Sequence, residues 1–242
     1  MIRNLYCPYC RGLLNEEPNS PKKSSVEHMI PNAALSRKRG KGDGDFFACR
    51  KCNGHKSNMD YVIGVISKSQ SANSNLVVDS LTRASTQTDG REKRFLDMMR
   101  TAVRKPDGNI HLKIPIHADD LISYMRYLGM GQYFKIHKRP FNPERYVMHL
   151  EFINKQVTQT FQASYQDTHH SNPFLDIQEN PHAEVIGDGE VIIWYKKDAY
   201  LFLFHHYVGF LIDIKKRCRR HVARAEQKEA YIRKHFRYGK LN

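Results

Sequence analysis

The organisation of this chain is decided by residues 49–56, which read CRKCNGHK and hold the second of two C-x-x-C pairs. The first pair, Cys7 and Cys10, stands near the start, and 38 residues separate the two pairs. Four thiolates are the set that a structural Zn²⁺ binds tetrahedrally. One zinc ion held by Cys7, Cys10, Cys49 and Cys52 would therefore join the two ends of a small N-terminal module, whose core alone is too small to be secure.

The composition indicates a basic protein that has enough apolar residues for a substantial core. The chain has 242 residues, a formal net charge of +14 and 40% hydrophobic residues. Proteins this basic are usually attracted to polyanions, of which nucleic acid is the commonest and an anionic membrane the competitor. The apolar run at residues 200–214 is interrupted by two histidines and is too short to span ~30 Å of hydrocarbon. Since no secretory core begins the chain, we expect a cytoplasmic protein without a membrane partner.

A second motif lies between the cysteine pairs, where residues 26–31 read VEHMIP. The order C-x-x-C, E-H-x-I-P and C-x-x-C-N resembles the HNH (ββα-metal) endonuclease family, and the resemblance covers about residues 6–61. It implies a zinc-stapled ββα-metal module, in which the zinc is structural and the catalytic metal is separate.

The resemblance also implies roles for three residues. His28 would be the general base, because neutral imidazole accepts a proton near neutral pH. Glu27 and Asn53 would bind the catalytic cation, and such oxygen donors suit Mg²⁺ or Mn²⁺. Hydrolysis of a phosphodiester needs these parts: a base for the attacking water and a cation for the charge on the phosphate.

The chain departs from the family pattern in one place. Relatives carry an asparagine about five residues before the third cysteine, where it orients the base. Here that stretch, residues 42–46, reads GDGDF. Asp43 and Asp45 are the two candidate substitutes.

Basic residues surround the two motifs and form a rim suited to a polyanion. His55 points to a different helix face from Asn53, which favours a phosphate contact or a supporting group over a metal ligand. For the loop at residues 37–41, plain solvation of its charges is the alternative. The candidate nucleic-acid-binding residues are Arg37, Lys38, Arg39, Lys41, Arg50, Lys51, His55 and Lys56.

Beyond the module of residues 1–61, we expect a connector at 62–90 and an α+β domain at 91–242. Apolar residues three and four apart predict helices over 91–104, 119–134 and 213–236, the last with Cys218 as a small buried residue. β-branched and aromatic residues predict strands over 109–115, 145–153, 156–165, 184–195 and 201–214, with a turn at residues 187–189, and so an antiparallel sheet. Residues 215–242 hold eleven Lys and Arg against two Glu. This basic helix is either a solvated face or a phosphate-binding one.

The leading hypothesis is a metal-dependent endonuclease that cuts DNA, with DNA favoured over RNA. A restriction or anti-phage defence effector fits the same active site, acting as a homo-oligomer or in an assembly with a sensor protein. The alternative is a non-catalytic zinc-knuckle nucleic-acid-binding protein, which the missing middle asparagine supports.

Overall fold

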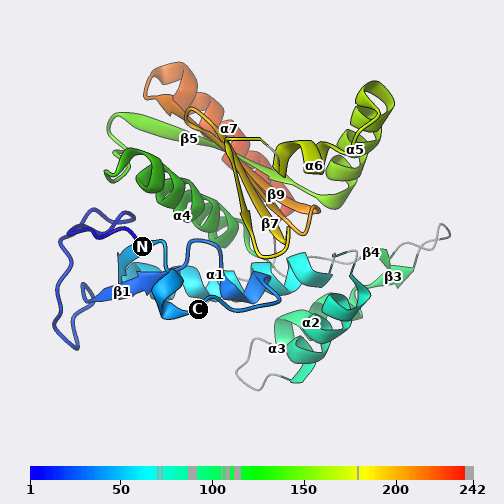
Figure 1. Cartoon of the computed structure of the whole chain (residues 1–242), viewed down its shortest axis with the longest axis horizontal. Coiled ribbons are helices and arrows are strands. Elements are labelled where there is room, and N and C mark those ends of the chain that lie inside the picture. The colour runs from blue at the N-terminus through cyan, green and yellow to red at the C-terminus, as the bar shows by residue number, and fades with distance from the viewer. Residues whose placement is uncertain are drawn as a thin grey trace.

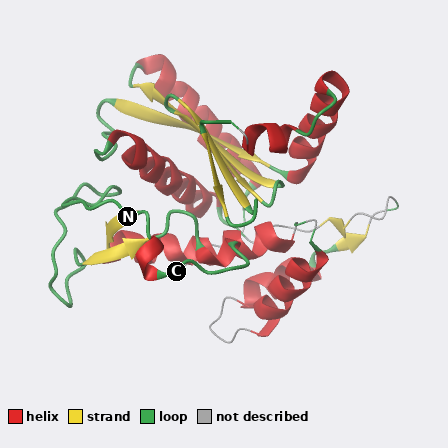
Figure 2. Cartoon of the chain, viewed as in Figure 1, coloured by secondary structure: helices red, strands yellow, loops and turns green. Residues whose placement is uncertain are grey.

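The computed structural model describes residues 1–69, 71, 73–86, 92–104, 106, 110–111, 116–178 and 180–237. The fold is α+β, as the sequence predicts, and its largest sheet has five antiparallel strands. Figure 1 shows the N-terminal segment and the long helix α1 (Arg50–Ser69) on one side of this sheet, and Figure 2 shows that helices pack around it. No helix among the described residues is long and apolar enough to cross a membrane.

The N-terminal unit consists of two short strands followed directly by a helix. Strand β1 (Ser24–Glu27) pairs antiparallel with β2 (Phe46–Cys49), and α1 (Arg50–Ser69) begins at the next residue. The loop between the strands contains two 3-10 turns, η1 (Asn32–Ala34) and η2 (Lys41–Asp43). The unit therefore has the β-β-α order, with one cysteine pair at the junction of β2 and α1.

Helix α1 is longer than the predicted module. Its last two turns lie beyond residue 61 and bury Val62, Ile63 and Ile66. Two further helices follow, α2 (Ser74–Thr86) and α3 (Glu92–Arg100), and then a short ladder of β3 (Val103–Arg104) and β4 (Ile110–His111). Of the strand predicted over 109–115, Ile110 and His111 are described, and residues 112–115 lie outside the described part.

The five-stranded sheet has the order β5-β9-β8-β7-β6, with every neighbour antiparallel. The turn at residues 187–189 joins β6 to β7, as predicted, and Gly187 and Gly189 have positive φ there. Helices α4 and α7 contact each other and β5, while α6 contacts β6. These elements are β5 (Tyr146–Ile153), β6 (Ala183–Ile186), β7 (Val191–Lys196), β8 (Ala199–Phe204), β9 (Val208–Lys216), α4 (Ala118–His137), α6 (Pro173–Gln178) and α7 (Arg219–His235).

Three sequence predictions in this region are wrong. Residues 156–165 form part of helix α5 (Lys155–His169) rather than a strand. Asn154 caps this helix by accepting from the Val157 amide, and the aromatic residues of the helix recur every four positions, as on one helix face. Residues 201–214 form two strands, since the chain turns at His205 and His206, both with positive φ. Cys218 is exposed before α7, and residues 213–216 belong to β9.

The packing of α1 on η1 predicts opposite effects for two glycines of this helix. A Cβ on Gly64 would lie 2.6 Å from the carbonyl carbon of Ala33, so Gly64→Ala is expected to lower the free energy of unfolding by about 1–3 kcal/mol. Nothing lies within 4 Å of the same position on Gly54. Gly54→Ala, the matched control, should raise it by about 0.5–1 kcal/mol. Urea unfolding measures both, and a shift in the same direction for the two variants would contradict this packing.

Candidate functional site

Four cysteine side chains converge at the base of the N-terminal unit. The sulfur atoms of Cys7, Cys10, Cys49 and Cys52 all lie within 4.8 Å of one another, and those of Cys10 and Cys49 are 3.8 Å apart. A tetrahedral zinc with Zn–S bonds of about 2.3 Å separates its sulfurs by about 3.8 Å. The predicted cluster is therefore formed, and its geometry is consistent with a structural Zn²⁺ site.

Local backbone structure holds the two cysteine pairs around one point. The first pair lies in a turn, where the Arg11 amide donates to the Cys7 carbonyl at 2.9 Å. The Cys49 amide donates to the Cys7 sulfur at 3.4 Å, and the Lys22 ammonium lies 3.6 Å from the Cys10 sulfur. Such donors stabilise thiolates, and the lysine offsets part of the negative charge of a four-thiolate site.

His28 lies just after β1 and lines a shallow cavity of about 240 Å³. Its Nε2 is 3.0 Å from the Gly40 carbonyl oxygen. Because a carbonyl only accepts, Nε2 carries the hydrogen, and Nδ1 is then the basic nitrogen of the neutral ring. With Nε2 held in this way, Nδ1 is the nitrogen of His28 that can accept a proton.

Asn53, on the first turn of α1, lines the same cavity as His28. Its amide nitrogen donates to the Ser25 hydroxyl and to the Val26 carbonyl, each at 3.0 Å. Both amide hydrogens are thus used to fasten α1 to β1. The side-chain oxygen is the atom left to bind a cation or a ligand.

Glu27 is placed differently from the sequence expectation. Its neighbour His28 lines the cavity, whereas the Glu27 side chain is buried, with 1% of it exposed. The Glu27 carboxylate lies 3.0 Å from the Lys56 ammonium and accepts a hydrogen bond from the Tyr9 hydroxyl at 3.0 Å. Burial raises the pKa of Glu27 to about 7, although Lys56 opposes this rise. The structure therefore places this carboxylate in the core beside the cavity, not among its lining residues.

Lys56 is not part of a basic rim, and this corrects the sequence prediction. Its side chain is fully buried, and its ammonium bridges Glu27 and both Asp60 oxygens, the latter at 2.8 and 2.9 Å. Burial alone would lower the pKa of Lys56, but the two carboxylates raise it above its ordinary value. The i, i+4 pair that it forms with Asp60 is an internal ion pair of α1.

Asp60 is a carboxylate of the cavity that the sequence analysis did not single out. It lines the cavity together with His28 and Asn53, and 16% of its side chain is exposed. Burial raises its pKa, partly offset by Lys56. Its signal in the sequence is positional: it stands seven residues after Asn53, so both lie on one face of α1.

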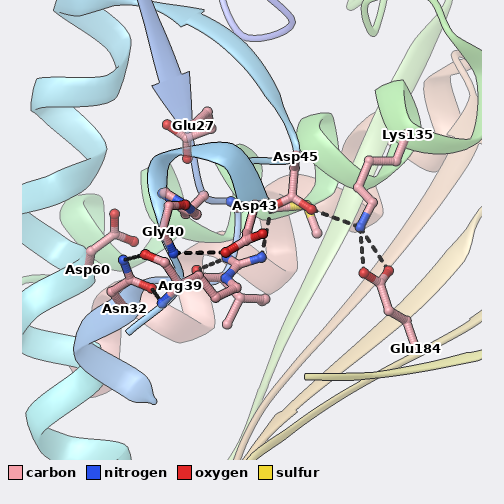
Figure 3. Close-up of polar contacts among 12 residues, drawn as sticks. Glu27, Asn32, Arg39, Gly40, Asp43, Asp45, Asp60, Lys135 and Glu184 are labelled. Carbon is pink, nitrogen blue, oxygen red and sulfur yellow. Dashed lines mark hydrogen bonds and ion pairs between the residues drawn. The ribbon is translucent and has the colours of Figure 1, made fainter. Parts of the chain in front are cut away.

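Of the two candidate substitutes for the middle asparagine, Asp45 is the one that contacts the backbone next to His28. It accepts from the Met29 amide at 2.8 Å, next to His28, and binds Arg39 at 3.4 Å and Lys135 at 3.1 Å. Lys135 in turn contacts Glu184 on β6 at 2.7 Å. Figure 3 shows the resulting chain of charges, which runs from the loop between β1 and β2 (the hairpin loop) to the five-stranded sheet. Burial favours a higher pKa for Asp45, but Lys135, Arg39 and the Met29 amide outweigh it and hold the pKa below its ordinary value.

Asp43 and the loop residues around it have a local role. Asp43 accepts from the Gly40 amide at 2.9 Å, and Asn32 and Arg39 exchange hydrogen bonds through the Asn32 side chain (Figure 3). These contacts fix the carbonyl that holds His28. Asp45, rather than Asp43, therefore reaches the backbone beside the histidine.

The other predicted rim residues divide into exposed and engaged groups. Arg39 is turned inward, donating to the Ile30 carbonyl as well as to Asp45, so it is not a free rim residue. His55 is exposed and lies 3.2 Å from the Tyr127 hydroxyl, away from the cavity of Asn53. The side chain of Lys41 lies outside the described part of the chain. Besides His55, the exposed members are Arg37, Lys38, Arg50 and Lys51.

The cysteine cluster predicts a zinc content of one per chain. Cys52→Ser is expected to lose the ion and to lower the melting temperature by about 10 °C or more, because the ion joins the start of the chain to α1. Cys218→Ser, which changes an exposed cysteine outside the cluster, should keep both zinc and stability. Elemental analysis and thermal unfolding test this, and a zinc-free parent would contradict it.

The charge network around Asp45 predicts a pH-dependent loss of stability in Asp45→Asn. Because the folded pKa lies below the unfolded one, the stabilisation is complete above the ordinary pKa and disappears as the pH falls through the folded value. We expect a cost of about 2–4 kcal/mol at neutral pH that shrinks below about pH 4. Urea unfolding from pH 3 to pH 7 measures it, and a cost independent of pH would contradict the charge network.

Comparisons with known proteins give no match for this chain. The chain matches no protein-family model, no curated protein and no solved structure. The site is therefore characterised by its own geometry: a four-cysteine cluster, and a cavity that holds an imidazole, an amide and a carboxylate.

Proposed function

We propose that this protein is a metal-dependent endonuclease that hydrolyses phosphodiester bonds in DNA. The observation that carries the proposal is that His28, Asn53 and Asp60 line one cavity beside the four-cysteine cluster. A base and two oxygen donors at one open surface are the parts that metal-assisted phosphodiester hydrolysis requires. The resemblance of the C-x-x-C, E-H-x-I-P and C-x-x-C-N motifs to HNH endonucleases points to the same reaction.

His28 is assigned the role of general base. The Gly40 carbonyl fixes its Nε2 hydrogen, so Nδ1 can take a proton from the attacking water. Asp45 supports this role, because it accepts from the amide of Met29, the residue after His28, and thereby holds the backbone of the histidine. The middle asparagine of the resembling family is replaced by an acid in this role.

The donor set of the cavity fits a hard divalent cation such as Mg²⁺ or Mn²⁺. The Asn53 oxygen and the Asp60 carboxylate are the donors, and Mg²⁺ commonly takes one or two protein oxygens while keeping water and substrate phosphate as its other ligands. When bound, such a cation supplies charge neutralisation at the phosphate and the leaving oxygen. Glu27 is assigned a positioning role through Lys56, which holds Asp60.

The protein's partner in this proposal is DNA, and the zinc site serves the fold rather than the reaction. A restriction or anti-phage defence role, with a homo-oligomer or a sensor protein as the assembly, is the biological setting we propose. The net charge of +14 favours capture of a polyanionic substrate.

The proposal predicts cleavage of supercoiled plasmid in the presence of Mg²⁺ or Mn²⁺. His28→Ala is expected to lower the rate by about 100-fold or more, since a positioned general base contributes about 10²–10⁴-fold. Asn53→Ala and Asp60→Asn should each raise the cation concentration needed for half-maximal cutting. His169→Ala, a change of an exposed histidine on α5, is the matched control and should cut like the parent.

A non-catalytic zinc-knuckle nucleic-acid-binding protein is the second candidate. The burial of Glu27 against Lys56 favours it, because the carboxylate that the motif implies as a metal ligand does not line the cavity. Retarded DNA mobility without cutting, equal in the parent and in His28→Ala, would establish this candidate in place of the enzyme.

A further inference from the structure

Exposed basic residues from separate segments meet at one end of the five-stranded sheet. Strand β5 begins there and β9 ends there, because Tyr146 pairs with Lys216. The β7–β8 turn lies at the same end, since Ala199 pairs with Asp213 of β9. Figure 1 shows the orange beginning of α7 near the green beginning of β5 at this end.

The end of α4 is fastened to the same place. The Tyr133 ring of α4 lies 6.1 Å from that of Tyr146, and His137 lies 2.8 Å from Asp198 in the β7–β8 turn. The Arg217 amide donates to the Arg145 carbonyl at 2.8 Å, which holds the exit from β9 beside the entry to β5. We name this surface the basic end, and it comprises Arg139, Arg145, Lys197, Lys216, Arg219 and Arg220, all exposed.

The basic end carries a large uncompensated charge. Residues 137–146, 196–199 and 213–220 together contain ten Lys and Arg but three acids, Glu144, Asp198 and Asp213. Asp198 is paired with His137, and Asp213 with Lys215. Arg219 and Arg220 lie in the first turn of α7, at the positive end of the helix dipole, which repels cations. No acidic residue in this turn offsets the repulsion. An external polyanion would relieve this repulsion.

The surface chemistry favours nucleic acid over a membrane. Membrane-surface binding combines basic residues with exposed apolar side chains that insert into the lipid. Of the exposed large hydrophobic side chains in the described part of the chain, none belongs to the three segments of the basic end. Cations spread over several segments, without an apolar anchor, suit the regularly spaced phosphates of a duplex.

We propose that the basic end binds the phosphate backbone of duplex DNA, as a second contact surface of the molecule. The choice of DNA rests on the proposed function. Lys135, in the last turn of α4 and four residues before Arg139, contacts Asp45, which binds the amide next to His28. A duplex on the basic end therefore lies near the N-terminal unit, and it is held by residues that take no part in the chemistry.

Binding of a fluorescent 30-base-pair duplex tests the proposal, measured by anisotropy between 50 and 200 mM salt. The protein is the full chain with His28→Ala, so that the probe stays intact. Adding Lys216→Gln, Arg219→Gln and Arg220→Gln should weaken binding by about tenfold or more and reduce the slope of log K against log salt by about 2–3, since each phosphate contact contributes about 0.9. The control adds Arg83→Gln, Arg100→Gln and Arg104→Gln, which removes the same charge from α2, α3 and β3.

Each outcome decides the proposal. An unchanged Kd in the first triple variant, or an equal loss in both, overturns it, since the second result would reflect net charge alone. Binding to phosphatidylserine vesicles with no binding to the duplex also overturns it, in favour of a membrane. Plasmid cutting by the parent separates the two proposals. If the parent cuts and the first triple variant binds the duplex normally, the proposed nuclease function stands and the basic end is rejected as a DNA-binding surface. If the first triple variant loses binding and the parent does not cut, the basic end stands and the nuclease function is rejected.

Discussion

Helix α4 is packed on two sides at once, and the position of the candidate site depends on this arrangement. Gly129 and Gly131 stand two positions apart, so they face nearly opposite directions on the helix. A Cβ on Gly129 would lie 2.9 Å from Ile212 of the sheet, and one on Gly131 would lie 2.9 Å from Met29. Neither face has room for a side chain. The sheet and the N-terminal unit therefore both approach the α4 backbone closely, and Met29 carries this constraint directly to His28.

The loop that follows His28 is held by residues distant in sequence. The Glu190 carboxylate accepts from the Ser36 amide at 2.9 Å, and His205 donates to the Ala34 carbonyl at 2.8 Å. Lys68 of α1 binds the carbonyl of Leu35 at 2.7 Å. Three consecutive residues of the loop thus have partners in α1 and in two turns of the five-stranded sheet. The C-terminal region is in this way a structural part of the candidate site, in addition to carrying the basic end.

Two internal lysines connect the elements around the cavity. Lys56 lies between Glu27 and Asp60, and Lys135 lies between Asp45 and Glu184. Removing a charge from water is costly unless partners surround it, so each lysine requires its two carboxylates. The first group binds α1 to β1, and the second binds the hairpin loop to α4 and β6. The same cations that raise the net charge therefore also fix the geometry of the site.

The sequence by itself determined the parts whose signals are local. Cysteine spacing predicted the four-thiolate cluster, residue pattern predicted the α+β class and most strands of the sheet, and the motif order singled out His28 and Asn53. Local patterns did not predict features that depend on partners distant in sequence. The sequence could not show that Glu27 and Lys56 face the core, or that Asp45 rather than Asp43 contacts the backbone next to His28. Only the tertiary structure decided that Asp60 joins the cavity and that basic residues from α4, β9 and α7 form one surface. Side-chain burial and charge pairing depend on which elements meet in space, and this is set by packing between segments that are distant in the sequence.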